Sequence, residues 1–124
     1  MSTLEILRIY ADREGCSHFE TDNVSLELHD YAPPAPPLYL SSKEISVANL
    51  FLELPAGWYG DWHPTPVRQW LVLISGTCEL EVEDGEKRTQ SAGDIVLLED
   101  TAGRGHKTRV IGDEPARMTA IHLT

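Results

Sequence analysis

The chain of 124 residues lacks the features that mark several classes of protein. Its two cysteines, Cys16 and Cys78, lie far apart and outside any metal-type spacing. A disulfide framework is therefore not expected, and free thiols fit a reducing cytosol. Only ten Lys and Arg stand against twenty Asp and Glu, which gives a formal net charge of −10. Without a basic stripe, neither nucleic acid nor an anionic membrane surface is an expected partner.

Long hydrophobic runs are also missing. The first residues, MSTLEILRIY, contain neither a basic segment nor an apolar stretch long enough to cross a membrane. We therefore expect no signal peptide and no transmembrane helix, and we expect a cytoplasmic protein.

What the chain does contain is a series of short apolar or alternating segments separated by turn residues. Residues 69–74 are apolar from the second position on, which predicts a strand covered on both faces, and residues 78–83 alternate acidic with apolar side chains. Asp84-Gly85 predicts a type I′ hairpin turn. Residues 4–10 are either a strand or a short helix. Further strands are expected at 24–29, 38–41, 45–54, 95–98, 107–111 and 117–123. The pattern predicts one all-β domain, a sandwich or a barrel.

The N-terminal third differs from the rest in composition. Residues 11–23 are polar and contain a glycine, so a loop is expected there. The segment YAPPAPP at 31–37 has four prolines, which favour an extended path and predict a stiff connector lying over the barrel. We divide the single domain 1–124 into N-terminal strands with this connector, residues 1–44, and a barrel core, residues 45–124.

Two stretches carry the residues of chemical interest. The first runs from Gly57 to Gly76, GWYGDWHPTPVRQWLVLISG, and contains His63, Thr65 and Gln69. The second is AGDIVLLEDTAGRGHKTRV, where a glycine-rich turn is followed by His106.

The first stretch resembles the first motif of the cupin superfamily, which is glycine, five residues, His-x-His, three or four residues, Glu, six residues, glycine. Its spacing matches, but Thr65 replaces the second histidine and Gln69 replaces the glutamate. The second stretch resembles the second motif, which is glycine, five residues, Pro-x-Gly, two residues, His. Here Glu99 and Thr101 replace the proline and the glycine, and His106 follows two residues late.

The chain is thus similar to small single-domain bacterial cupins of the cupin 2 type, with a degenerate set of metal ligands. It is also similar to a subgroup with a GDWHP…RQ core and an EDT-x-G-x-GH loop. The resemblance covers about residues 45–124 and implies a cupin-type β-barrel, a jelly-roll-like double-stranded β-helix. It also implies that His63, Gln69 and His106 converge on a divalent transition metal, namely Zn, Fe, Mn or Ni. Because Gln69 brings no charge, it is either a ligand or a hydrogen-bonding residue of the pocket.

Four further residues are candidates for contact with a substrate: Asp61, Trp62, Thr65 and Arg104. Asp61 either restores the missing negative charge or caps a turn as an exposed residue. Trp62 either helps to wall a pocket for a flat ligand or packs at the rim. Thr65 orients a neighbour or a substrate. Arg104 either binds an anionic substrate or is a solvated surface residue.

Three functions stay open on the sequence alone. The first is a metal-dependent isomerase, lyase or dioxygenase acting on an organic metabolite, with the altered ligand set favouring Lewis-acid over redox chemistry. The second is a metal-free module that binds or senses a small ligand. In the third, the two histidines act as acid–base catalysts without a metal. The doubly covered strand and the exposed-looking N-terminal strands also predict a homodimer.

Overall fold

The computed structural model describes all residues from 1 to 124, and its regular elements are all β-strands. The strands are β1 (Ser2–Ala11), β2 (Ser17–His29), β3 (Leu38–Leu40), β4 (Ser46–Leu54), β5 (Tyr59–His63), β6 (Gln69–Ser75), β7 (Thr77–Glu81), β8 (Lys87–Ser91), β9 (Ile95–Glu99), β10 (His106–Ile111) and β11 (Ala116–Leu123). The chain offers no helix with the length and hydrophobicity that a membrane crossing requires.

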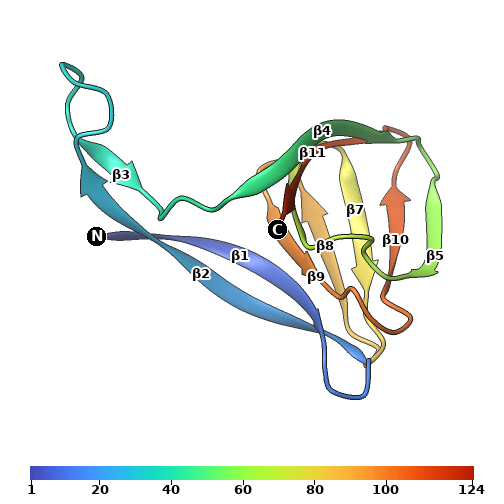
Figure 1. Cartoon of the computed structure of the whole chain (residues 1–124). Helices are drawn as coiled ribbons and strands as arrows, with labels where there is room; N and C mark the ends of the chain where they lie inside the picture. The colour runs from blue at the N-terminus through green and yellow to red at the C-terminus, as the bar shows by residue number, and fades with distance from the viewer.

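The strands form two sheets that face each other (Figure 1). The larger sheet has the order β3-β2-β1-β9-β6-β11-β4, and the smaller has the order β5-β10-β7-β8. Apolar side chains of both sheets meet between them, with Ile9 and Val82 in one cluster and Cys78 and Met118 in another. The predicted all-β, jelly-roll-like fold is confirmed, although the sheets do not close into a continuous barrel.

The N-terminal hairpin projects as an arm from the two facing sheets, which we call the barrel. β1 pairs with β2 along its whole length, but with β9 only through residues 7–10. Residues 1–5 and 23–45, which we call the arm, project from the barrel at the left of Figure 1. The proline-rich segment 31–37 lies at the tip of the arm, so its expected position over the barrel is wrong. It is carried there because β3 pairs with the far end of β2.

Three other expectations also fail. Residues 17–23 are not a loop but the first half of β2, because pairing with β1 outweighs the low strand propensity of acidic residues. β5 and β8 are not among the predicted strands.

The Asp84-Gly85 turn does join β7 to β8, but it is not of type I′. Gly85 has a φ of 92° while Asp84 does not adopt a positive φ, and the Gly85 N–H donates to the carbonyl of Val82. The turn is thus of type I, followed by a left-handed glycine.

Glu99, the last residue of β9, links β1 to the segment that precedes β6. Its carboxylate accepts hydrogen bonds from Arg8 of β1 and from Arg68, which precedes β6. Burial alone would raise the pKa of Glu99, but the two guanidinium groups outweigh burial and hold the pKa below its usual value. Arg68 also reaches Glu44 at the base of the arm. These contacts lie on the outer face of the large sheet, as strand parity predicts for Arg68.

The loop 100–105, which leads into β10, is held by close backbone packing. Gly105 has a φ of 77°, and a Cβ there would overlap the carbonyl of His63. Gly103 packs equally closely on Gly15 in the β1–β2 turn. The buried hydroxyl of Ser17 donates to the carbonyl of Gly105 at 2.6 Å and accepts from a backbone N–H of the β7–β8 turn at 2.9 Å. The position of this loop is therefore fixed from two sides.

Replacement of Glu99 by glutamine should destabilise the protein by about 1–3 kcal/mol at neutral pH, because Arg8 and Arg68 lose a charged acceptor. Since the folded-state pKa of Glu99 is lowered, its stabilisation is present above the unfolded pKa and is lost as pH falls through the folded pKa. The difference between wild type and Glu99→Gln in urea unfolding should therefore shrink in acid. Glu53→Gln removes an exposed pair with Arg117 and should cost less than about 1 kcal/mol. Equal effects of the two substitutions would contradict this account.

Alanine at position 105 should cost more than about 3 kcal/mol of unfolding free energy, since strain at positive φ is added to a backbone clash. Gly112→Ala is the matched control, because Gly112 has a φ of 86° but a Cβ added there would meet no atom within 4 Å. It should cost only about 1–2 kcal/mol. Thermal or urea unfolding measures both variants, and a Gly105→Ala protein as stable as Gly112→Ala would refute the close packing on His63.

Candidate functional site

A cavity of about 160 Å³ lies between the two sheets. This is close to a cavity of roughly 150 Å³ that holds benzene in another protein. Ten of its seventeen lining residues are hydrophobic, and its polar residues include His63, Thr65, Gln69 and His106. An apolar wall with a few convergent polar groups is typical of a small-molecule site.

The structure brings the two singled-out histidines together. His63 at the end of β5 pairs directly with His106 at the start of β10. Their ring centroids are 4.6 Å apart, and the ring planes are inclined by 55°. One small ligand or ion can therefore contact both rings.

A β-bulge in β5 turns His63 towards the cavity. Between two paired positions, β10 advances by two residues, from His106 to Thr108, while β5 covers three, from His63 to Gly60. The extra residue breaks the alternation of side chains, so Gly60 and His63 share a face. A Cβ at Gly60 would lie 2.5 Å from the ring of Trp58, which lines the cavity. Glycine at this position makes room for that ring.

Both histidines are held through Nδ1. His63 Nδ1 donates to the backbone carbonyl of Asp61 at 2.6 Å, because a carbonyl oxygen can only accept. His106 Nδ1 donates to the Asp100 carboxylate, also at 2.6 Å. With the hydrogen on Nδ1, each neutral ring keeps its lone pair on Nε2. The site thus offers two imidazole rings that share one tautomer, each with an unprotonated Nε2.

Asp100 is the residue that sequence analysis misses. It is fully buried; one carboxylate oxygen accepts from His106, and the other, Oδ1, has no hydrogen-bond partner. A buried carboxylate is costly unless a positive charge balances it. Strand parity could have found this residue, because Val96 and Leu98 line the cavity and Asp100 continues their face.

Gln69 and Thr65 are bonded to each other inside the cavity. Gln69 Nε2 donates to Thr65 Oγ1 at 2.9 Å, and the Thr65 hydroxyl donates to the carbonyl of Val67 at 2.6 Å. These bonds occupy the Thr65 hydroxyl and leave the amide oxygen of Gln69 free. Thr65 therefore orients Gln69, whose amide oxygen has no hydrogen-bond partner in the protein.

Asp61, Trp62 and Arg104 do not line the cavity. The exposed Asp61 carboxylate accepts from the backbone N–H of Trp62, and only its carbonyl serves His63. The Trp62 ring contacts two cations, with Arg104 Cζ at 4.7 Å and Lys107 Nζ at 4.8 Å from its centroid. The bulge places Asp61 and Trp62 away from the inner face, and their contact with a substrate stays a prediction.

Comparison with known proteins agrees with this architecture. A family model described as Cupin domain matches residues 50–122. A Cupin 2 conserved barrel domain protein from Salinispora arenicola has a similar fold, with a TM-score of 0.53 and 20% identity over 82% of this chain and 76% of that one. A cupin-2 domain containing protein from Shewanella frigidimarina gives a TM-score of 0.46 and 17% identity over 61% and 69% of the two chains. A putative ethanolamine utilization protein Q from Salmonella typhimurium gives 0.46 and 14% over 99% and 98%.

No sequence among the curated proteins matches the chain. The resemblance noted from the two motifs is nevertheless confirmed, since the matched family model spans more than half of the chain. The chain belongs to the cupin domain family.

Proposed function

We propose that this cupin is a metal-dependent enzyme that acts on a small organic metabolite, with His63, Gln69 and His106 as the metal ligands. The observation that carries the proposal is the shared tautomer of the two neighbouring imidazoles. Both Nδ1 atoms are bound to protein acceptors, so both Nε2 lone pairs are available, and the ring centroids are only 4.6 Å apart.

The residues present fit a divalent transition metal. Imidazole nitrogens and an amide oxygen suit Zn, Fe, Mn or Ni. Metal-ligating histidines usually donate their other N–H to a carboxylate or a backbone carbonyl, and His106 and His63 do so with Asp100 and Asp61. The unpartnered Oδ1 of Asp100 also supports a cation in this region, because the buried carboxylate then has a balancing charge.

The chemistry that such an ion supplies is polarisation of a carbonyl or enolate oxygen, as in isomerase or lyase reactions. The chain's own residues define what can bind. Leu71, Leu73 and Val96 form part of the apolar wall of this cavity, whose volume of about 160 Å³ suits a small ligand.

A metal-free binding or sensing function is the alternative. It is favoured by the two changed ligand positions, Thr65 and Gln69, which are bonded to each other. A third candidate uses the His106–Asp100 pair as an acid–base catalyst, because Asp100 holds the imidazole as in other His–carboxylate pairs. Metal binding separates the first function from both of these.

Untagged protein incubated with Zn²⁺ and desalted should retain one equivalent more metal than His63→Ala or His106→Ala, measured by elemental analysis. The reason is that each variant removes a ligand. Asp100→Asn should weaken this binding by about 10–100-fold, because the buried carboxylate no longer supports His106. His29→Ala is the matched control, since His29 is exposed on β2, outside the cavity. Equal metal contents in wild type and both cavity variants would favour a metal-free function.

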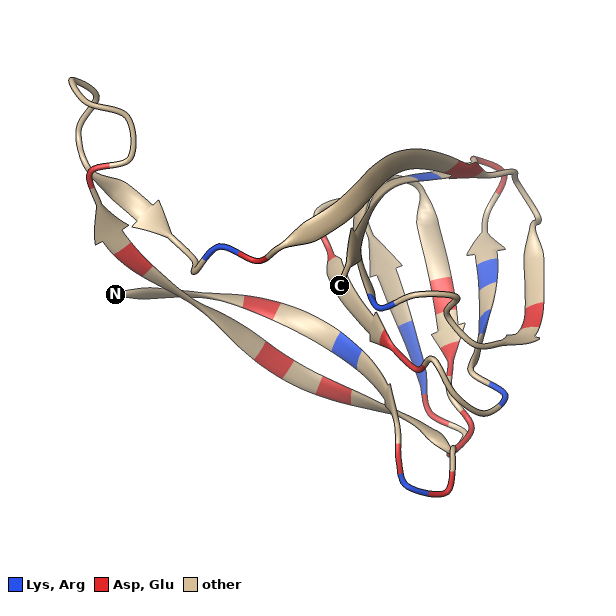
Figure 2. Cartoon of the chain, viewed as in Figure 1, with Lys and Arg blue, Asp and Glu red and all other residues tan.

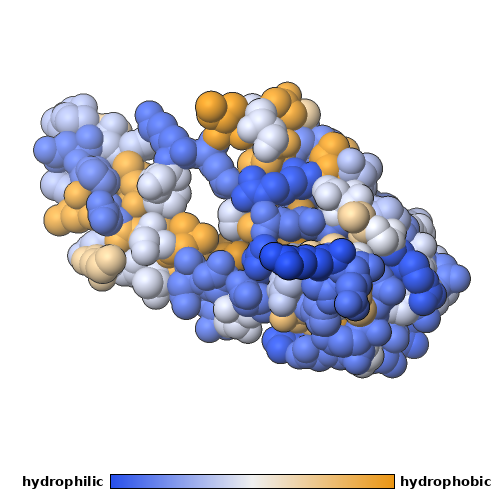
Figure 3. All heavy atoms as spheres, turned by 60° about the horizontal axis from the view of Figure 1, so that its bottom comes forward, coloured by the Kyte–Doolittle hydropathy of each residue, from blue (hydrophilic) through white to orange (hydrophobic).

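We also propose that the chain forms a homodimer through the arm and β4. Large hydrophobic residues are exposed on the arm, among them Leu28, Tyr31 and Ile45, and on β4, among them Phe51 at 81% exposure. Figure 3 shows hydrophobic residues on the arm at the left and again along the upper border of the barrel. β4 pairs only with β11, so its other edge is free. An extended arm and an unpaired apolar edge strand are suited to contact with a second copy.

Phe51→Glu should convert the dimer to a monomer, because it places a charge in the interface while Leu52, on the opposite face of β4, keeps lining the cavity. Light scattering coupled to size exclusion gives the molar mass. Ile111→Glu is the control, as it adds the same charge at another exposed apolar position, on β10. A monomeric wild type, or a dimeric Phe51→Glu protein, would remove the proposal.

A further inference from the structure

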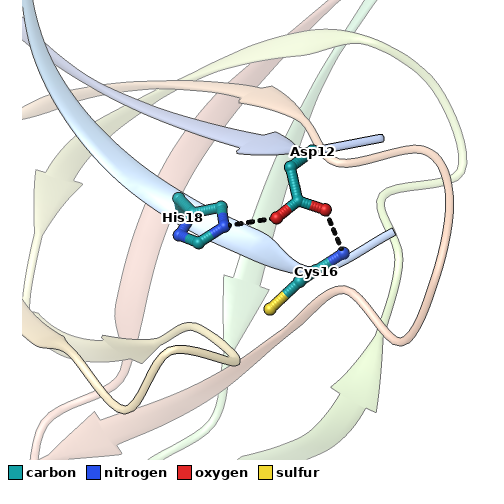
Figure 4. Close-up of side chains that lie close together, drawn as sticks. All are labelled: Asp12, Cys16 and His18. Carbon is teal, nitrogen blue, oxygen red and sulfur yellow. Dashed lines mark hydrogen bonds and ion pairs between the residues drawn. The ribbon is translucent and has the colours of Figure 1, made fainter. Parts of the chain in front are cut away.

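The β1–β2 turn carries a second group of metal-binding side chains, apart from the cavity. Asp12, Cys16 and His18 each offer one donor atom, and the three atoms lie within 4.8 Å of one another. Figure 4 shows the three side chains around the start of β2. None of them lines the cavity between the sheets.

The backbone of the turn fixes the orientation of Asp12. Its Oδ1 accepts hydrogen bonds from the N–H groups of Glu14 and Cys16, at 2.9 and 3.0 Å. Its Oδ2 is then directed at Nε2 of His18, at 2.7 Å. One carboxylate oxygen therefore shapes the turn, while the other faces the imidazole and is free to exchange that contact for a cation.

A carboxylate from a different turn holds the other nitrogen of His18. Asp84, between β7 and β8, places Oδ2 2.8 Å from His18 Nδ1, and its Oδ1 accepts from the N–H of Glu86 at 2.9 Å. A carboxylate on the second ring nitrogen is the usual support of a metal-ligating histidine. Because Asp84 holds Nδ1 of His18, the other ring nitrogen, Nε2, is the one directed at Asp12 and placed to bind a metal.

We propose that Asp12 Oδ2, Cys16 Sγ and His18 Nε2 bind a zinc-type divalent cation. A thiolate and an imidazole select Zn²⁺ or Co²⁺ over Mg²⁺ and Ca²⁺, which prefer oxygen ligands. Tetrahedral zinc places its donor atoms roughly 3.3–3.8 Å apart. Donor atoms at the 4.8 Å limit would therefore close by about 1–1.5 Å, while Asp12 Oδ2 and His18 Nε2, at 2.7 Å, would separate by about 0.6–1.1 Å. Three protein ligands leave the fourth position to water or a small ligand.

The local charge favours a cation at this place. Burial raises the pKa of the Cys16 thiol. Four carboxylates on the two turns raise it further, namely those of Asp12, Glu14, Glu83 and Asp84. Figure 2 shows these acidic residues on the two neighbouring turns at the bottom of the view. A divalent cation is attracted by the same carboxylates, and its binding releases the protons of the Cys16 thiol and of His18 Nε2 to solvent.

The proposed site braces the loop that leads to His106. Gly15 lies within the metal-binding turn and packs against Gly103, and Ser17 follows Cys16 and bonds to Gly105. A cation bound there would hold the β1–β2 turn, on which the loop 100–105 packs. The second site does not depend on the function proposed for the cavity, because it uses none of the cavity residues.

Titration of the untagged full chain with Co²⁺ tests the site directly. A sulfur-to-cobalt charge-transfer band should appear with one equivalent and should vanish on addition of Zn²⁺. The band should be lost in Cys16→Ser and in His18→Gln, and retained in two matched controls, Cys78→Ala and His29→Gln. It should also persist in the His63→Ala/His106→Ala double variant, so that failure of this site and failure of the cavity site are distinguishable.

Alkylation of the wild-type protein provides a second readout that needs no variant to fold. Zn²⁺ should slow the reaction of Cys16 with iodoacetamide at least tenfold, as followed by mass spectrometry of the peptide. Absence of the cobalt band in wild type, an unchanged band in folded Cys16→Ser, or alkylation that Zn²⁺ does not slow would each overturn the proposal.

Discussion

The hydrogen bond from His106 to the buried carboxylate of Asp100 is the interaction on which the proposed chemistry depends. It fixes the tautomer of the imidazole and places a buried carboxylate beside it. His63 reaches the same tautomer by a different route, since the bulge in β5 turns the ring inward and the Asp61 carbonyl accepts the hydrogen bond from its Nδ1. A buried side chain in one case and a backbone carbonyl in the other thus set the same tautomer in two histidines that line one small cavity.

The surroundings of the site show why the loop sequence is rich in glycine. Gly105 lets the start of β10 approach the carbonyl of His63, and Gly103 lets the same loop rest on the β1–β2 turn. Ser17 joins these parts through one buried hydroxyl. The turn that carries Cys16 and the strand that carries His106 are therefore parts of one packed unit, which links the second proposed metal site to the position of the first.

Strand patterning predicted the all-β fold, because alternation reports directly on side-chain direction. The resemblance to the two cupin motifs implied that His63, Gln69 and His106 converge, and the three residues line one cavity. The sequence could not predict that Asp61 and Trp62 face away from the cavity, since a bulge breaks the alternation without any local signal. β8 escaped prediction because its polar residues carry no hydrophobic pattern. The first half of β2 escaped because long-range pairing with β1 decides its structure. The alternation of side chains along β9 could have identified Asp100, but the cupin motif has no ligand at that position.

The most direct test of the central claim is a long-range proton–nitrogen correlation spectrum of the histidine side chains, recorded first without metal and then with Zn²⁺. We predict that the neutral rings of His63 and His106 both carry their hydrogen on Nδ1, and that Zn²⁺ shifts the Nε2 resonances of both. A hydrogen on Nε2 of either ring, or Zn²⁺-induced shifts that leave both of these rings unchanged, would contradict the claim.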